Sequence, residues 1–130
     1  MKLAKQSGIY SLADLRQHYE NKTKGHWFSP GAMGFFRSRL SQTLHYGARS
    51  IYFVSSEQGP SGVRRFSVRR YDVESGSIDT VGDFQAYKSL SGAQARAERL
   101  AHRELRSLPK QLQEDHGFID HDYYGKDRGF

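Results

Sequence analysis

The chain has 130 residues, with 20 Lys and Arg against 14 Asp and Glu, so its formal net charge is +6. This length predicts one domain with a single modest core. The absence of cysteine excludes disulfides, thiolate metal sites and a cysteine nucleophile. A mean hydropathy of -0.78 and the lack of a long apolar run exclude a membrane helix and a secretory signal. We therefore expect a soluble cytoplasmic protein with no membrane partner.

The positive charge is concentrated in the body of the chain. Residues 1–109 contain 17 Lys and Arg and 9 Asp and Glu, whereas residues 110–130 contain 3 and 5. A basic body suits a protein that is attracted to polyanions, and an acidic tail tempers that attraction. We therefore predict a single domain over residues 1–109 and a polar, acidic C-terminal tail over residues 110–130.

A first helix is predicted near the N-terminus. Ser11 can cap it, because a serine hydroxyl accepts a hydrogen bond from a free amide of the first turn. Asp14, three residues later, is favourable at the positive end of the helix dipole. Apolar residues then recur at helical spacing, so the helix is expected to run to Tyr19 or Glu20.

A second helix is predicted to begin at Ser29 and Pro30. Serine caps the helix, and proline at the first helical position loses no hydrogen bond. The apolar stripe of this helix extends to Leu40, so Arg37 and Arg39 are expected to project from its sides.

The middle of the chain has the pattern of an antiparallel β-sheet. Residues 51–54 are continuously apolar, as in a strand that is covered on both faces. Residues 65–69 alternate between apolar and polar side chains. Residues 78–87 form a third strand, bent at Gly82. Because short turns join these segments, we predict a three-stranded antiparallel meander.

The second of these strands carries arginine on one side. Phe66 and Val68 should face the core, whereas Arg65 and Arg69 should share the outer face with Ser67. Basic and aromatic side chains on an exposed sheet face are typical of surfaces that bind single-stranded nucleic acid. The same charges can also serve only to prevent edge-to-edge pairing between sheets.

A long amphipathic helix is predicted from Ala93 to Leu108, with a cap at Ser91 and a stop at Pro109. Alanine and leucine cover one side of it, and the small alanines allow close approach to a sheet. We expect an α+β fold with two short N-terminal helices, a three-stranded antiparallel meander and a C-terminal helix packed on one sheet face. The other face would stay open, which leaves room for a homodimer.

The best candidate for a binding surface lies on this last helix. Four arginines recur at spacings of three, four and three residues, which places them within an arc of about 80°. That arc lies away from the alanine and leucine side, and the glutamates of the helix project elsewhere. A row of guanidinium groups suits a phosphate backbone or an acidic protein surface, and it also fits an ordinary solvated helix face.

No enzyme signature is recognisable in the sequence. There is no P-loop, dinucleotide-binding, nucleophile-elbow or metalloprotease motif. Histidines and aspartates between residues 116 and 122 are irregularly spaced, so we predict no metal site, and no cofactor is expected. Histidine, tyrosine and arginine could still converge in the folded chain to form a small phosphodiester-cleaving site.

Four blocks of sequence together resemble a known family. The first block contains an aromatic pair, a serine cap and Met-x-Phe-Phe. The blocks are Gly25–Phe36, Ile51–Glu57, Arg65–Arg69 and Ile78–Tyr87. In this order they look like a family of small uncharacterised proteins carried by bacteriophages and other mobile elements, with the likeness spanning residues 12–101. The resemblance implies a mobile-element origin, but it implies no activity and no catalytic residues.

We therefore expect a non-enzymatic binding protein of a phage or mobile element that acts in the cytoplasm of a bacterial host. Its basic faces would engage host nucleic acid or a nucleoprotein, and inhibition of a CRISPR-type defence complex is the most specific form of this hypothesis. The alternatives are a DNA-binding regulator and a small phosphodiester-cleaving enzyme. The candidate binding residues are Arg96, Arg99, Arg103, Arg106, Arg65, Arg69, Arg37 and Arg39.

Overall fold

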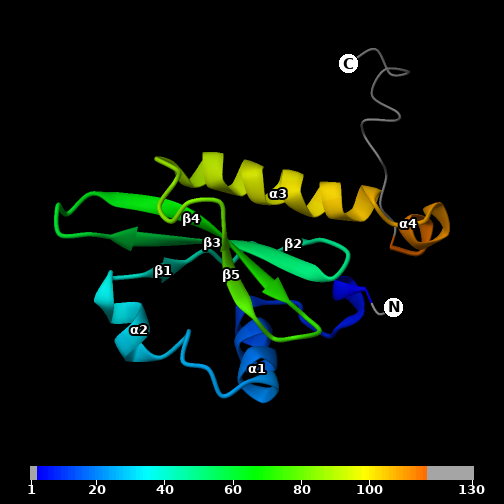
Figure 1. Cartoon of the computed structure of the whole chain (residues 1–130), viewed down its shortest axis with the longest axis horizontal. Coiled ribbons are helices and arrows are strands. Elements are labelled where there is room, and N and C mark those ends of the chain that lie inside the picture. Colours follow the sequence, from blue (N-terminus) through cyan, green and yellow to red (C-terminus); the bar gives the residue numbers. More distant parts are fainter. Residues whose placement is uncertain (1–2, 117–130) are drawn as a thin grey trace, which may run out of the picture.

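A five-stranded antiparallel sheet separates two layers of helix in the computed structural model of the chain, which describes residues 3–116 (Figure 1). The helices are the 3-10 helix η1 (Ala4–Gln6), α1 (Leu12–Lys22), α2 (Pro30–Phe35), α3 (Leu90–Arg106) and α4 (Lys110–His116). The strands are β1 (Arg39–Leu40), β2 (His45–Tyr46), β3 (Ser50–Gln58), β4 (Arg64–Asp72) and β5 (Ile78–Val81). The predicted α+β class is confirmed.

β3 is the central strand of the sheet. β4 pairs with it along its whole length, with Ser50 opposite Asp72 and Gln58 opposite Arg64. β1 and β2 follow one another along the other edge of β3, and β5 pairs with the far edge of β4. The predicted meander is therefore present as β3, β4 and β5, but two short strands extend the sheet beyond it.

Each main helix begins after a serine whose hydroxyl accepts a hydrogen bond from a first-turn amide. Ser11 caps α1 and Ser29 caps α2, as predicted. α3 is capped by Ser89 rather than Ser91, with the Ser89 hydroxyl 3.1 Å from the amide of Gly92. The helix therefore starts earlier than its apolar pattern predicted.

α2 ends sooner than its apolar stripe predicted, and two glycines among its six residues make it a weak helix. Ser38 donates its amide to the carbonyl of Met33 at 2.7 Å, and Arg37 donates to that of Gly34 at 3.2 Å. This pair of bonds is a Schellman cap, in which Arg37 holds the left-handed position with φ of 49°. The expectation of a helix as far as Leu40 was wrong, because Leu40 lies in β1.

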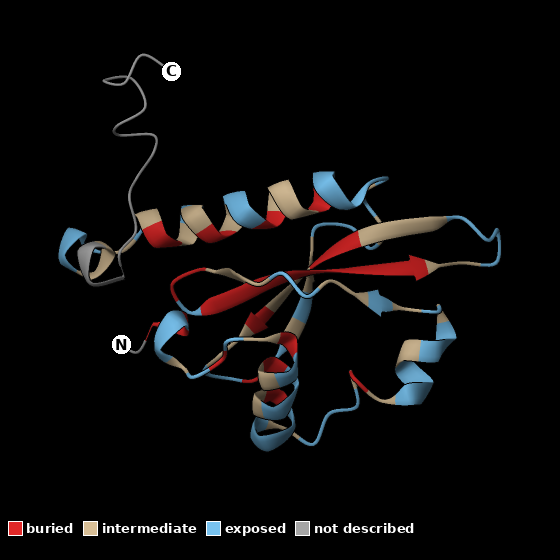
Figure 2. Cartoon of the chain, turned by 180° about the vertical axis from the view of Figure 1, so that it is seen from behind, coloured by how far each residue is buried: buried red, intermediate tan, exposed pale blue. Residues whose placement is uncertain are grey.

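Both faces of the sheet are covered, and all but the last residue of β3 is buried (Figure 2). One core lies between α1 and the sheet and includes Leu15, Phe28 and Phe53. The other lies between α3 and the sheet, where alanines of the helix meet Val54 and Val68. The expectation of an open sheet face was wrong, because α1 and the segment after it cover that face. The argument for a homodimer through an open face therefore does not hold.

The chain continues as a helix beyond the predicted end of the domain. α4 starts at Lys110, directly after Pro109, and Gln113 donates its side-chain amide to the carbonyl of Leu108 at 2.8 Å. The rest of the predicted acidic tail, residues 117–130, lies outside the described residues. Within residues 3–116, none of the helices combines the length and the apolarity needed to cross a lipid bilayer.

Candidate nucleic-acid interface

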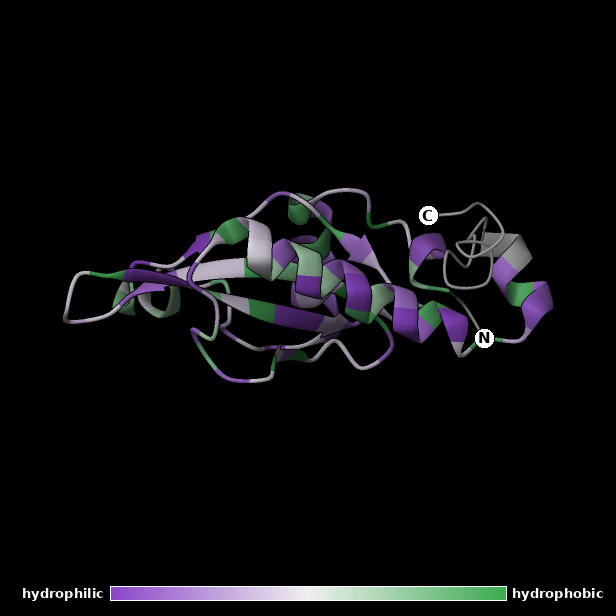
Figure 3. Cartoon of the chain, turned by 90° about the horizontal axis from the view of Figure 1, so that it is seen from above, coloured by the Kyte–Doolittle hydropathy of each residue, from purple (hydrophilic) through white to green (hydrophobic). Residues whose placement is uncertain are grey.

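α3 has one side in the core and the opposite side towards solvent. The side that packs on the sheet consists of Ala93, Ala97, Ala101 and Leu105. The opposite side, here called the arginine face, consists of Arg96, Arg99, Arg103 and Arg106. Arg99 and Arg103 are exposed, and the two outer arginines are half-buried. Figure 3 looks down on this helix and shows hydrophilic residues recurring along it. The helical rise places the first and last arginines about 15 Å apart along the axis.

Three guanidinium groups of the arginine face have no partner among the described residues. Arg96, Arg99 and Arg103 make no hydrogen bond or ion pair there. The exposed carboxylate of Glu98 lies 4.0 Å from His102 instead. Like charges spaced by three and four residues repel one another and weaken a helix. The row therefore costs some stability, and Arg96, Arg99 and Arg103 form no ion pair within the described residues that offsets this cost.

Glu104 fixes the rotation of α3. Its carboxylate accepts hydrogen bonds from the amides of Arg49 and Ser50, at 2.6 and 3.0 Å, and from the hydroxyl of Tyr52 at 2.7 Å. Burial and the bond to Glu104 raise the pKa of Tyr52 to about 12. Gly47 permits the contact, because a Cβ there would lie 2.8 Å from the carboxylate. These bonds join the helix to the start of β3 and keep the arginine face towards solvent.

Arg69 of β4 does not lie on an open platform. Its guanidinium is 3.3 Å from the carboxylate of Glu57, and its Nε donates to the hydroxyl of Ser55 at 2.8 Å. Only 13% of the Arg69 side chain and 1% of the Glu57 side chain are exposed. The rings of Trp27 and Phe84 lie 5.5 and 5.3 Å from the guanidinium carbon. The expectation that Arg69 faces outward was wrong, because aromatic rings and a buried carboxylate occupy that side of the strand.

The buried ion pair is the centre of a polar network. Ser67 donates its hydroxyl to the Glu57 carboxylate at 2.8 Å and accepts the amide of Gln85 at 2.8 Å. Gln85, which has φ of 57°, also donates its side-chain amide to the Glu57 carbonyl at 3.0 Å. Arg69 completes the network through Thr80. Both carboxylate oxygens of Glu57 already accept hydrogen bonds from Ser67 and Arg69, so none is left for a ligand. The network therefore serves to hold the segment after β5 against β4.

Arg65 is bound to the same segment. Its guanidinium donates to the carbonyl of Ala86 at 3.0 Å, and the residue is half-buried. This contact lies next to an isolated bridge between Phe66 and Tyr87. The expectation of a strand as far as Tyr87 was wrong, because β5 ends at Val81 and a turn follows it. Arg65 and Arg69 therefore make internal contacts, in contrast to Arg96, Arg99 and Arg103 of the arginine face.

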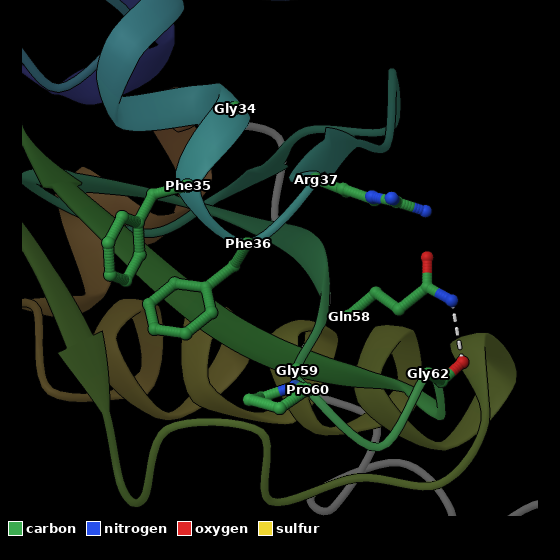
Figure 4. Close-up of a pocket in the computed structure, with 8 residues that line it drawn as sticks. All are labelled: Gly34, Phe35, Phe36, Arg37, Gln58, Gly59, Pro60 and Gly62. Atoms are coloured by element: carbon green, nitrogen blue, oxygen red, sulfur yellow. Dashed lines mark hydrogen bonds between the residues drawn. The ribbon is translucent and has the colours of Figure 1, made fainter.

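Arg37 and Arg39 are exposed, and each lines a separate hollow. The larger hollow, of about 390 Å³, lies between the end of α2 and the β3–β4 turn (Figure 4), and we call it the aromatic groove. Its lining includes Phe35, Phe36 and Arg37. The smaller hollow, of about 160 Å³, lies between β1 and the start of α3 and is lined by residues that include Arg39 and Leu90.

The histidines and acidic residues of the described part of the chain do not converge on a metal site. Among residues 3–113, whose side chains are described, no three His, Asp or Glu side chains are placed to hold an ion. His18 bonds to the hydroxyl of Tyr71, and His45 bonds to the side chain of Gln94. Both histidines therefore take part in contacts between the helices and the sheet.

Comparison with known proteins places the chain in a family. A family model matches residues 11–98, a range close to that of the resemblance noted in the sequence, and it is described as a family of unknown function, DUF7447. The match runs from the cap of α1 into α3, so it includes Glu57, Arg69 and Arg96 but ends just before Arg99. No curated protein and no solved structure matches the chain. The chain belongs to this family of unknown function.

Proposed function

We propose that the protein is a non-enzymatic binding protein whose arginine face engages the phosphate backbone of nucleic acid, either free or within a nucleoprotein. The observation that carries the proposal is the row of four arginines on the solvent side of α3, three of them without a partner among the described residues. Guanidinium groups form charge-assisted and often bidentate hydrogen bonds with phosphate. The net charge of +6 adds attraction at longer range.

The spacing of the arginine face suits a repeating anion. Successive arginines are separated by about 4.5–6 Å along the helix axis. One base step of duplex DNA is about 3.4 Å per strand, so long and flexible side chains on this row can reach successive or alternate phosphates. Contacts of this kind carry affinity without sequence information. The proposal therefore predicts binding with little dependence on base sequence.

The proposal includes an origin in a phage or other mobile element, which is supported by the four sequence blocks described above. In that setting the protein would act in the cytoplasm of the bacterial host, by occupying host nucleic acid or a nucleoprotein. A CRISPR-type defence complex is a target of this kind, because it contains nucleic acid whose phosphates the arginine face could engage. Occupancy alone would block such a complex, and it requires no catalytic site.

Charge reversal on the arginine face tests the proposal. Arg99→Glu combined with Arg103→Glu should leave the free energy of unfolding unchanged or slightly raised. Both side chains are exposed, and the substitutions remove the repulsion between neighbouring arginines of the row. Two lost contacts of about 1.5–3 kcal/mol each predict a fall in affinity of roughly 100-fold or more for labelled DNA or RNA.

A matched control separates the arginine face from net charge. Lys22→Glu with Lys24→Glu makes the same change in charge at exposed positions near the end of α1. We expect this control to weaken binding much less. Equal loss in both double variants, or unchanged affinity in the folded Arg99 and Arg103 variant, would contradict the proposal.

A further inference from the structure

The aromatic groove exposes a phenylalanine that the core does not use. Phe35, the last residue of α2, is 78% exposed, although large aromatic side chains are usually buried. Its ring is edge-on to that of Phe36, with centroids 4.6 Å apart, and Phe36 in turn lies 5.5 Å from Phe84. Figure 4 shows the rings of Phe35 and Phe36 on one side of the groove and Arg37 on the other side. The ring of Phe35 is therefore exposed to solvent, while its contact with Phe36 holds it in place.

Arg37 presents its side chain at the same groove from an unfavourable backbone conformation. It holds the left-handed position of the Schellman cap, with φ of 49°, where glycine is the usual residue. A residue with a Cβ is strained in this conformation, and glycine is not. Strained positions of this kind are typical of functional sites.

Neighbouring residues hold this turn in place. Arg64 donates to the carbonyl of Arg37 at 2.9 Å, and the amide of Gln58 donates to the carbonyl of Phe36 at 2.7 Å. The guanidinium of Arg37 itself makes no hydrogen bond or ion pair with another described residue, and the side chain is exposed. The surrounding structure thus fixes the backbone of Arg37 while leaving its charged group available to a ligand.

The composition of the groove selects the ligand. None of the described residues that line it is acidic, and the lining combines aromatic rings with the one guanidinium group of Arg37. Its volume of about 390 Å³ lies in the range of sites for small ligands. A nucleotide matches both features, because its base stacks on an aromatic ring and its phosphate pairs with arginine. Only an unpaired base has a free face for such stacking.

We infer that the aromatic groove binds an unpaired nucleotide, so that the ligand of this protein is single-stranded nucleic acid. This inference rests on the proposed function and specifies its substrate class. Arg39, two residues after Arg37, lines the smaller hollow together with Leu90, the first residue of α3.

The test uses the full chain and three labelled probes: oligo-dT and oligo-U of about 12 nucleotides, and a DNA duplex of the same length. Phe35→Ala should weaken binding of the single strands by about 5- to 100-fold and leave duplex binding unchanged. Tyr10→Ala is the matched control, because Tyr10 is also 78% exposed and lies outside the groove. This control should bind all three probes as the unmodified protein does.

Arg37 allows a second test that a merely structural role would not pass. Arg37→Gly should raise the melting temperature, because it relieves the left-handed strain, and should still weaken binding of the single strands. Arg37→Ala should weaken binding to the same extent without the gain in melting temperature. Unchanged single-strand affinity in the glycine variant would overturn the assignment of Arg37.

The outcomes separate the two proposals. If the unmodified protein binds single strands in a manner that depends on Arg99 and Arg103 but not on Phe35 or Arg37, the groove inference is wrong and the proposed function stands. Equal affinity of the unmodified protein for duplex and single strands would likewise show that the groove inference is wrong, while the proposed function would stand. If no oligonucleotide binds the unmodified protein, as expected for a protein that docks only an acidic protein surface, both proposals are wrong.

Discussion

The guanidinium of Arg69 lies 3.3 Å from the carboxylate of Glu57, on a face of the sheet that is closed to solvent. Trp27 and Phe84 flank the guanidinium, and hydroxyl groups of the neighbouring strands complete its hydrogen bonds. Arginine therefore has two different roles in this protein. At Arg69 of β4 it is a buried cation that joins strands and a loop, whereas at Arg99 and Arg103 of α3 it is an exposed cation with no ion pair among the described residues.

Loss of the buried cation should be costly. Arg69→Ala leaves the carboxylate of Glu57 buried without its counter-charge, and removal of one partner from such a pair typically costs about 3–5 kcal/mol. Urea denaturation of the variant should show a free energy of unfolding lower by this amount. Glu57→Gln with Arg69→Met, which removes both charges, should recover much of the loss. A decrease below about 1 kcal/mol for Arg69→Ala would mean that the network contributes little to stability.

Glu104 should contribute far more to stability than Glu98 on the same helix. Glu104→Ala removes three hydrogen bonds to a carboxylate, and we expect a loss of about 2–4 kcal/mol in the free energy of unfolding. Glu98→Ala is the matched control, since that side chain is 60% exposed, and it should change stability by less than about 0.5 kcal/mol. Similar losses in the two variants would show that Glu104 does not anchor α3.

The close approach of Gly47 to Glu104 predicts that substitutions at these two positions have non-additive effects on the free energy of unfolding. Gly47→Ala places a Cβ 2.8 Å from the carboxylate, which must then shift away from its donors. We expect the alanine to destabilise the native protein but to have a much smaller effect in the Glu104→Ala background. A double-mutant cycle measured by urea denaturation tests this coupling, and additive effects would contradict it.

Two tyrosines predict how stability depends on alkaline pH. Burial, with the bond to Glu104, raises the pKa of Tyr52 to about 12, and burial, with the charge of Asp72, raises the pKa of Tyr71 to about 12. The fold favours the neutral phenols, whereas in the unfolded chain both ionise near pH 10. Stability should therefore be constant with respect to these groups below pH 10 and fall between pH 10 and about 12. Unfolding measured across this range, with phenolate absorbance as a second readout, tests the prediction; constant stability up to pH 12 would contradict it.

The local elements of the fold could be predicted from the sequence because their signals are local. Ser11 and Ser29 cap their helices through contacts within one turn. The alanine and leucine side of α3 follows from helical spacing alone. The meander follows from three strands joined by short turns. Each of these predictions depends on residues that are close together in the chain.

What the sequence did not reveal depends on contacts between distant segments. Alternation shows that Arg69 lies on one side of β4, but not that Trp27 covers that side. Glu104 follows Ala97 by seven residues, so helical spacing places it towards the sheet. The reason for a carboxylate at this position is the pair of amides at the start of β3 that donate to it, and the helix sequence alone does not reveal them. The aromatic groove likewise forms only when the end of α2 meets the β3–β4 turn.

The salt dependence of binding tests the central claim, that the arginine face neutralises phosphates, most directly. The slope of log affinity against log salt concentration for a single strand is about -0.7 for each phosphate neutralised. Four arginines therefore predict a slope near about -3 for the unmodified protein, and Arg99→Gln with Arg103→Gln should reduce its magnitude by about 1.4. A slope that is the same in the variant and in the unmodified protein would contradict the claim.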